Sequence, residues 1–492
     1  MKKLDFNTLK THLFKAADIL RGRIDSGEYK QYIFGLLFLK RLNDVFIEEV
    51  EKQIKKGIKE ELARNDRDFH SFFVPERARW EELRKISRDV GAGLNKAFEV
   101  LEDENPILQG VLTAINFNDK ERLPDDVLQR LIIHFSEYNL GNINLEDADI
   151  LGRAYEYLIE MFADDAGKKG GEFYTPKQIV KLIVELVDPK KGMRVYDPAC
   201  GSGGMLIYSA LHVQEKNGGP LNLSLYSQER NLNTWAICKM NLLLHDLPDA
   251  HVEKGDTLRN PKFLDEGEIQ QFDRVIANPM WNQKDWNKDY LESDPYGRMI
   301  YGLPSASSGD WAWVQHMLAS LNKDGKMGVV LDNGVLFRGG IEGEIREKII
   351  KEDLISAVIA LPLNLFYNTG SPGCILILER NKPQERKVKI IFIYGEEDFE
   401  DRKRQNYLRD KDIEKILNAF KNFKDIEKYC HVAGFEEIKE NDFNLSVPRY
   451  VDTIPDEEPV DIKGVLNELK KIEKEREKTK QKVEGYLKEL GF

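Results

Sequence analysis

The segment from Asp197 to Gly204, read Asp-Pro-Ala-Cys-Gly-Ser-Gly-Gly, follows a short apolar run and opens a helical pattern. The glycines let the backbone turn tightly and approach a ligand, while the helix N-terminus presents unpaired N–H groups. Glu229 ends the next apolar run, where a carboxylate can accept hydrogen bonds from both ribose hydroxyls. Asp256 follows the third run and could accept from an adenine amino group. The pattern predicts a nucleotide-type pocket, although neither GxGxxG nor GxxxxGK[ST] is present.

A second chemical signal is Asn278-Pro279-Met280-Trp281, directly after another apolar run. The Asn278 amide oxygen and the Pro279 carbonyl are two acceptors held side by side, because proline restricts its own backbone and that of the preceding residue. Such a pair suits an exocyclic amino group. Trp281 offers a flat face for a base, worth about 1–3 kcal/mol in single-stranded contacts. Taken alone, the tetrapeptide also fits an Asn-Pro turn with a core tryptophan.

The elements that position these residues are short apolar runs separated by helical patterns, which favour an α/β fold with a mostly parallel, doubly wound sheet. Ligands bind beyond the carboxyl ends of such strands, so we expect the glycine turn and the Asn-Pro motif to lie at the same edge of the sheet. The expected strands are 194–197, 223–226, 250–254, 272–277, 327–331, 357–361 and 374–378, and the expected helices are 177–187, 235–244, 311–321 and 343–351. The first 140 or so residues have apolar residues at helical spacing.

Composition limits the function classes. The chain has 492 residues, 41% of them hydrophobic, with a net charge of −12, so it folds into real cores but has no global attraction for a polyanion. No apolar run is long enough for a membrane span and no signal peptide is visible, so we expect a cytoplasmic protein. The widely spaced cysteines Cys200, Cys238, Cys374 and Cys430 indicate reduced, packed thiols and no zinc knuckle.

The tail is rich in Lys and Glu, with apolar residues thinly spread. A four-three spacing predicts a coiled-coil-like helix with two polar seam positions, Arg476 and Thr479. Its seam is Val465, Leu469, Ile472, Arg476, Thr479, Val483, Tyr486 and Leu490. Either docking on a partner helix or folding back on its own domain would bury this stripe.

Taken together, the glycine turn and Asn-Pro-Met-Trp resemble the cofactor and catalytic motifs of amino-group DNA methyltransferases. Further segments resemble the modification (methyltransferase) subunit of type I restriction–modification systems, in the family's order and over nearly the whole chain. They are 16–22, 32–40, Glu172-Phe173-Tyr174-Thr175-Pro176-Lys177, Asp310-Trp311, 333–338, 361–370 and 444–452.

The resemblance implies a Rossmann-like S-adenosylmethionine-dependent methyltransferase domain over 146–455, a helical N-terminal domain over 1–145 and a docking tail over 456–492. It implies transfer of a methyl group to N6 of a flipped adenine in double-stranded DNA. The catalytic residues would be Asn278, Pro279 and Trp281, with Phe366 as a second face for the base. The methionine end of the cofactor would lie near Glu172 to Lys177 and Gly201, Ser202, Gly203 and Gly204, after Asp197, with the ribose at Glu229 and the adenine at Asp256.

The same resemblance implies partners. A separate specificity subunit would select the DNA sequence and bind two modification subunits, and a motor/nuclease restriction subunit would join them. No metal is expected in the reaction. Met280 stands where the family usually has proline. Thr175-Pro176 also fits a helix start, as N-cap and first helical residue.

Two alternatives remain at this stage. One is a methyltransferase of RNA or of protein glutamine, because related motifs serve planar amino groups in general. The other is a catalytically silent DNA-binding scaffold, which the departure at Met280 keeps open.

Overall fold

The computed structural model describes residues 3–146, 150–161, 174–217, 222–367, 369–403, 405–453 and 462–491. They divide into two compact units, Met1–Val451 and Asp452–Phe492, which are described separately. Among the described residues, no helix has both the length and the apolarity needed to cross a membrane.

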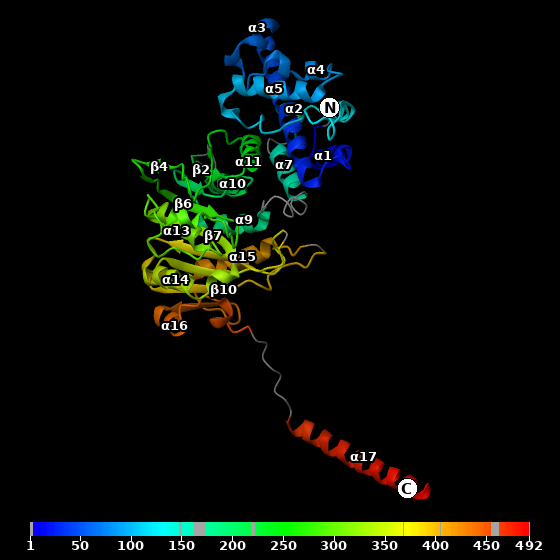
Figure 1. Ribbon diagram of the computed structural model, residues 1–492, viewed down its shortest axis with the longest axis vertical. Coiled ribbons are helices and arrows are strands. Elements are labelled where there is room, and N and C mark those ends of the chain that lie inside the picture. The colour runs from blue at the N-terminus through cyan, green and yellow to red at the C-terminus, as the bar shows by residue number, and fades with distance from the viewer. Residues whose placement is uncertain are drawn as a thin grey trace. The chain divides into compact units, whose positions relative to one another are not determined.

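The first part of the larger unit is helical (Figure 1). Its helices are α1 (Phe6–Leu20), α2 (Ser26–Lys55), α3 (Glu60–Asn65), α4 (Trp80–Leu83), α5 (Val90–Glu104), α6 (Asp125–Phe135) and α7 (Ile150–Met161), with short 3₁₀ turns at Arg67–Phe69, Glu76–Ala78, Pro106–Leu108 and Asn142–Asn144. This region shares one continuous core with the next: Tyr155 of α7 stacks on Phe34 at 3.7 Å, and its hydroxyl donates to the Ile237 carbonyl at 3.2 Å.

The second part is built on a nine-stranded sheet, in the order β11-β10-β8-β9-β7-β6-β1-β2-β3. The strands are β1 (Arg194–Asp197), β2 (Ser224–Glu229), β3 (His251–Lys254), β6 (Phe272–Ala277), β7 (Leu321–Asp332), β8 (Ile355–Ala360), β9 (Gly373–Glu379), β10 (Lys389–Tyr394) and β11 (Cys430–Gly434). A small separate hairpin pairs β4 (Leu264–Asp265) with β5 (Glu268–Ile269). The strand runs expected from the sequence all lie in the large sheet, whereas β10 and β11 were missed.

Most strand pairings in the sheet are parallel, as expected, but three are antiparallel, so the sheet is mixed. Strands β3, β2, β1, β6 and β7 are parallel neighbours, but β9 runs antiparallel between β7 and β8, and β11 runs antiparallel to β10. The connection from β8 to β9 explains this arrangement: its described residues contain no helix, and a parallel neighbour needs a longer crossover.

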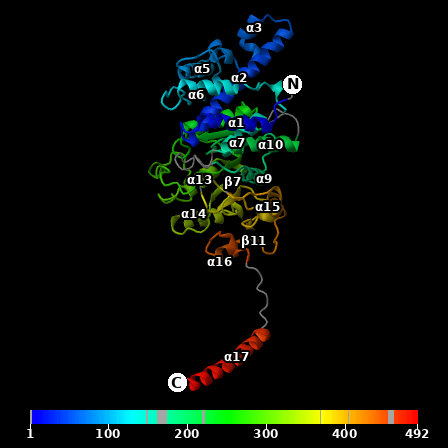
Figure 2. The same ribbon diagram turned by 90° about the vertical axis from the view of Figure 1, so that its right-hand side faces the viewer.

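Helices cover both faces of the sheet. Figure 2 shows α13 and α14 on one face of β7, and α9 and α15 on the other. Alternate residues of β6 face the two cores, Ile276 with α9 and α10, and Val275 and Ala277 with α13 and α14. These helices are α9 (Lys177–Val187), α10 (Gly204–Asn217), α11 (Leu232–Leu244), α12 (Lys288–Leu291), α13 (Asp310–Ala319), α14 (Ile341–Lys351), α15 (Asp410–Asn422) and α16 (Phe435–Glu440), with 3₁₀ turns at Asn333–Leu336, Gln384–Arg386 and Val447–Arg449.

The smaller unit contains one long helix, α17 (Ile462–Glu489). The apolar residues of the predicted seam are exposed, from 49% at Val483 to 73% at Leu490.

Candidate active site

The site lies where the order of the sheet reverses. From β1 the chain continues outward through β2 and β3 and then returns to β6 on the other side of β1. Parallel pairing aligns Tyr196 with Val275, so the segments that follow β1 and β6 leave the same edge side by side. In doubly wound sheets this switch point is where ligands bind.

The turn after β1 needs its glycines. Gly201 and Gly203 have φ of +53° and +86°, a region that side chains disfavour. At Gly203 a Cβ atom would also lie 2.9 Å from the Cys238 sulfur. The backbone therefore turns closely over α11 and enters α10 at Gly204.

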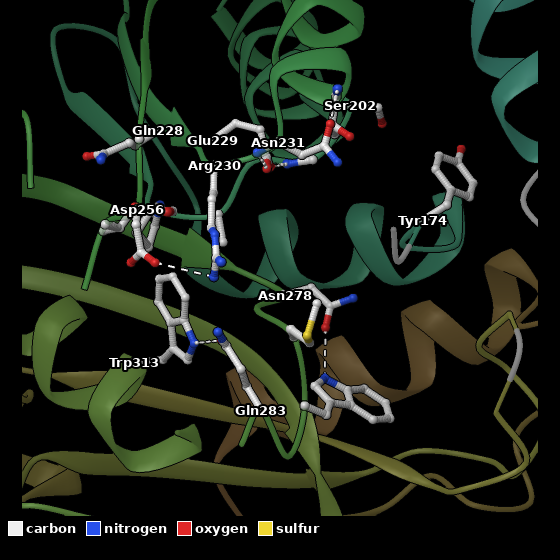
Figure 3. A pocket seen from close by; sticks show the side chains of 18 of the residues that line it. Tyr174, Ser202, Gln228, Glu229, Arg230, Asn231, Asp256, Asn278, Gln283 and Trp313 are labelled. Atoms are coloured by element: carbon white, nitrogen blue, oxygen red, sulfur yellow. Dashed lines mark hydrogen bonds and ion pairs between the residues drawn. The ribbon is translucent and has the colours of Figure 1, made fainter. Parts of the chain in front are cut away.

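A cavity of about 750 Å³ opens at this edge (Figure 3). It brings together many of the residues assigned from the sequence: Tyr174, Gly201, Ser202, Glu229, Asp256, Asn278 and Trp281. A smaller adjoining cavity adds Thr175, Lys177, Asp197 and Gly204. Pro176, Gly203, Pro279 and Phe366 lie close by in sequence or space but do not line either cavity, while Glu172 and Phe173 lie outside the described residues.

Two carboxylates dominate the electrostatics of the glycine turn. Burial, together with the nearby negative charge of Glu229, raises the pKa of Asp197 to about 8. Asp197 accepts one hydrogen bond, from the Ala199 N–H at 3.0 Å. Glu229 accepts from the N–H groups of Gly201 at 3.0 Å and Asn231 at 2.8 Å, one on each carboxylate oxygen. A cationic ligand group would stabilise the ionised form of Asp197.

Asp256 is held by its own loop. One oxygen accepts from the N–H groups of Leu258 and Arg259, and the other accepts from the Asn287 amide at 2.9 Å. Arg230 lies 3.4 Å from that second oxygen, and Figure 3 shows the pair at one side of the cavity. The Arg230 side chain is 66% exposed, so it can move away when a ligand approaches Asp256.

Asn278 is fixed from two sides. Its amide nitrogen donates to Thr175 Oγ1 at 2.8 Å, and its oxygen accepts from the Trp281 indole N–H at 3.0 Å. The Trp281 N–H is also 3.2 Å from the Val330 carbonyl, and its ring meets Phe366 edge to face at 4.7 Å. Helix α9 begins at Lys177 with Pro176 as its cap, so Thr175 is not the N-cap expected from the sequence. The Thr175 hydroxyl instead accepts the hydrogen bond from Asn278.

The loop after Trp281 is anchored at several points. The Asn282 N–H donates to the buried Asp310 at 2.8 Å, and Arg338 donates to the Asn282 side chain and, at 2.9 Å, to Asp332. Met280 itself is 39% exposed and lines the cavity.

The structure adds residues that sequence reasoning missed. Lys30 of α2 and Ile159 of α7 line the main cavity from the helical region, and Gln283 and Trp313, 3.4 Å apart, line its other side. Cys200 and Cys238 lie 3.6 Å apart, and this hydrogen bond together with burial raises the pKa of the Cys200 thiol. All four cysteines are buried and free. No local pattern signals these contacts, because the partners are far apart in the chain.

A Rossmann-like sheet with a glycine turn after its first strand and Asn-Pro at the neighbouring strand end defines a methyltransferase of amino groups. Comparison with known proteins agrees. Residues 146–459 match the N-6 DNA Methylase family, and residues 9–135 match the HsdM N-terminal domain.

The type I restriction enzyme MjaVII methylase subunit of Methanocaldococcus jannaschii is 38% identical over 99% of this chain and 85% of its own length. The HindI methylase subunit of Haemophilus influenzae is 37% identical over 78% of this chain and 91% of its own. The crystal structure of the type I methyltransferase subunit from Streptococcus thermophilus superposes with a TM-score of 0.80 at 31% identity, covering 91% of this chain and all of that one.

The chain therefore belongs to the methylase subunits of type I restriction–modification systems, within the N-6 DNA methylase family. It is an adenine-specific DNA methyltransferase. The resemblance, the fold class and the activity expected from the sequence are confirmed, and the alternatives of an RNA or glutamine methyltransferase and of a silent scaffold are set aside.

Proposed function

We propose that the two cavities hold S-adenosylmethionine, with its methionine end between Tyr174–Lys177 and the glycine turn, its ribose at Glu229 and its adenine near Asp256. The cavity of about 750 Å³ is large enough for such a molecule. The charge also fits, because this ligand carries an ammonium and a sulfonium, and the buried Asp197 lies in the smaller cavity beside Lys177 and Asn278. The bound cofactor supplies an electrophilic methyl group.

The target adenine flips out of the duplex, because its amino nitrogen is inaccessible inside it. The oxygen of Asn278 and the carbonyl of Pro279 accept hydrogen bonds from the two amino hydrogens. Those bonds favour a more tetrahedral nitrogen whose lone pair faces the methyl group. Trp281 and Phe366 offer aromatic faces beside the base. Positioning and oriented dipoles supply most of the acceleration.

The observation that carries this assignment is the double hold on Asn278. The Trp281 indole N–H can only donate, so the group that faces it is the Asn278 oxygen, and the amide nitrogen is held by Thr175. An oxygen has two lone pairs, and a second one remains for an amino hydrogen.

We further propose that a separate specificity subunit, bound by two copies of this chain, supplies sequence selection, and that a restriction subunit joins for cleavage. A chain with a net charge of −12 benefits from a more basic partner, since phosphate contacts dominate DNA affinity. The exposed seam of α17 offers a surface for another helix.

The test is methyl transfer by the assembled complex. With labelled S-adenosylmethionine and unmethylated DNA carrying the target site, we expect label in N6-methyladenine after digestion to nucleosides. Label in any other base, or none with wild-type protein that binds the cofactor, would contradict the proposed role.

A further inference from the structure

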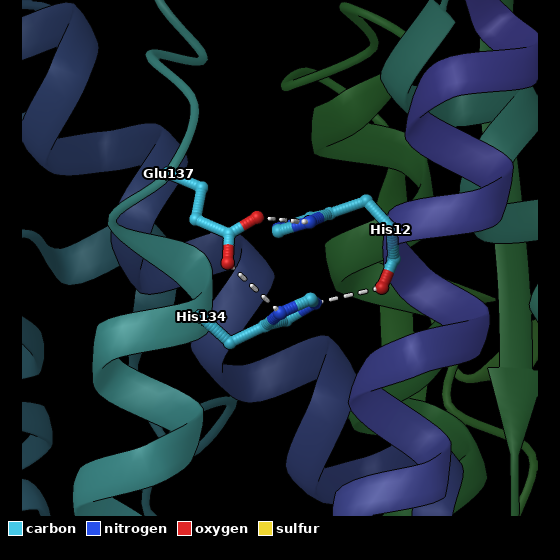
Figure 4. A group of neighbouring side chains, drawn as sticks. All are labelled: His12, His134 and Glu137. Carbon is cyan, nitrogen blue, oxygen red and sulfur yellow. Dashed lines mark hydrogen bonds and ion pairs between the residues drawn. The ribbon is translucent and has the colours of Figure 1, made fainter.

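A second cluster of chemically capable side chains lies in the helical region, outside the cavities described above. His12 of α1, His134 at the end of α6 and Glu137 just after it meet although His12 is more than 120 residues away (Figure 4). Both histidines are buried, at 4% and 8% exposure. Within the part of the chain that the structure describes, this trio alone brings three metal-binding side chains within 4.8 Å of one another.

The hydrogen bonding of His134 leaves a lone pair facing Glu137. Its Nε2 lies 2.8 Å from the backbone carbonyl of His12, which can only accept, so Nε2 carries a proton. In the neutral ring the lone pair is then on Nδ1, the atom nearest to Glu137. Outer hydrogen bonds of this kind are typical of metal-binding histidines.

The cationic side chains nearest to His12 are Lys15 and Lys40. Lys40 is paired with Asp44, which compensates its charge.

The distances suit a bridging ion better than hydrogen bonds. Nδ1 of His12 and Nδ1 of His134 each lie 3.7 Å from a different oxygen of Glu137. This is too long for a hydrogen bond. With metal–ligand bonds of about 2.0–2.2 Å, two ligands on one tetrahedral ion are about 3.4 Å apart, which a small side-chain movement reaches.

The present ring positions require one adjustment. The two imidazoles stack at 3.8 Å with 16° between their planes, so one ring must turn about its Cβ–Cγ bond to aim both lone pairs at a common point. Glu137 is 56% exposed, which gives an ion a path from solvent and leaves room for a water ligand.

We propose that His12, His134 and Glu137 bind one divalent transition-metal ion, with zinc the ion that two imidazoles and a carboxylate suit best. The site would fasten α1 to the end of α6. It is separate from methyl transfer, for which no metal is invoked.

The test uses the untagged full-length chain, freed of metal by chelation and titrated with zinc chloride against a chromophoric chelator. We expect one bound equivalent, and a loss of affinity of about 10-fold or more in Glu137→Gln, since even outer-shell changes cost this much. Glu137 is half exposed, so this variant should fold, and circular dichroism checks that it does. Zinc should raise the melting temperature of the wild type by more than that of the variant.

Two matched controls identify the site. Glu437→Gln removes a carboxylate 3.0 Å from another histidine, His431, and should leave zinc binding unchanged. Cys200→Ser should also leave it unchanged. No saturable binding, equal binding by Glu137→Gln, or loss of binding in Cys200→Ser, which would assign the ion to the Cys200–Cys238 thiols, would each overturn the proposal.

Discussion

The amide nitrogen of Asn278 donates a 2.8 Å hydrogen bond to the hydroxyl of Thr175, a residue 103 positions earlier in the chain. Thr175 lies just before α9 and Asn278 just after β6. The contact therefore joins the proposed methionine end of the cofactor pocket to the proposed acceptor of the target amino group. It fixes the orientation of the Asn278 amide group.

The first prediction concerns Thr175 as a positioning residue. In Thr175→Val the Asn278 amide N–H loses its acceptor and the amide turns more freely, so kcat should fall about 10-fold, the equivalent of one hydrogen bond. Thr175→Ser keeps the hydroxyl and should restore most of the rate. The assay is single-turnover methylation by the assembled complex. An unchanged kcat in the valine variant would show that Trp281 alone orients Asn278.

Asn278→Ala should remove methylation while leaving cofactor binding nearly intact, because the amide acts on the substrate nitrogen. Loss of one preorganised acceptor costs on the order of 100-fold or more in rate. Titration calorimetry with S-adenosylmethionine measures the affinity for the cofactor. Asn233→Ala, at the exposed start of α11, is the control and should match wild type in both assays. A tenfold loss of cofactor affinity in Asn278→Ala would refute the assignment.

Glu229→Ala should weaken S-adenosylmethionine binding by roughly 10- to 150-fold, through loss of charge-assisted hydrogen bonds to the ribose. Glu229 also accepts from Gly201 and Asn231, so part of the loss comes from the turn itself. Glu229→Gln keeps one acceptor oxygen, so its affinity for S-adenosylmethionine should lie between those of the wild type and Glu229→Ala. Calorimetry distinguishes the three proteins, and equal affinities would move the ribose elsewhere.

The pH dependence of stability follows from Asp197. Burial raises its pKa from 3.8 to about 8 in the folded chain, so between these values the folded protein keeps a proton that the unfolded chain has released. Stability from this group is therefore complete at low pH and is lost as pH rises towards about 8. Asp197→Asn does not titrate and keeps an oxygen for the Ala199 N–H.

Scanning calorimetry without cofactor measures the effect. The melting temperature of Asp197→Asn minus that of wild type should grow by roughly 3 °C or more between about pH 5 and pH 8.5. Asp249→Asn, in the exposed turn before β3, should show no such trend. A constant difference across this range would mean that Asp197 is already ionised in the free protein.

The seam of α17 should be needed for assembly and not for cofactor binding. Replacing Leu469 and Ile472, which are 52% and 61% exposed, by Asp should prevent co-purification with the specificity subunit. Deletion from Val465 onward should have the same result, and both proteins should still bind S-adenosylmethionine. Lys474→Asp, off the seam, is the control. A stable complex of the deleted protein in size-exclusion chromatography would assign the helix to another role.

The sequence by itself determined the parts of the site that depend on local chemistry. The glycine turn, Glu229 and Asn278-Pro279 stand at strand ends in the sequence, and strand ends in a doubly wound sheet share an edge, so their meeting could be predicted. Helix α9 was predicted to the residue, because hydrophobic periodicity is a short-range signal.

Only the tertiary structure decided which distant residues touch. The antiparallel β9, Lys30 in the main cavity, the Cys200–Cys238 pair and the meeting of His12 with His134 and Glu137 join segments tens to more than a hundred residues apart. The same is true of Thr175, whose sequence context indicated a helix cap while packing brought its hydroxyl to Asn278. Such contacts arise from how helices and strands pack into common cores, and no local pattern in the chain records that packing.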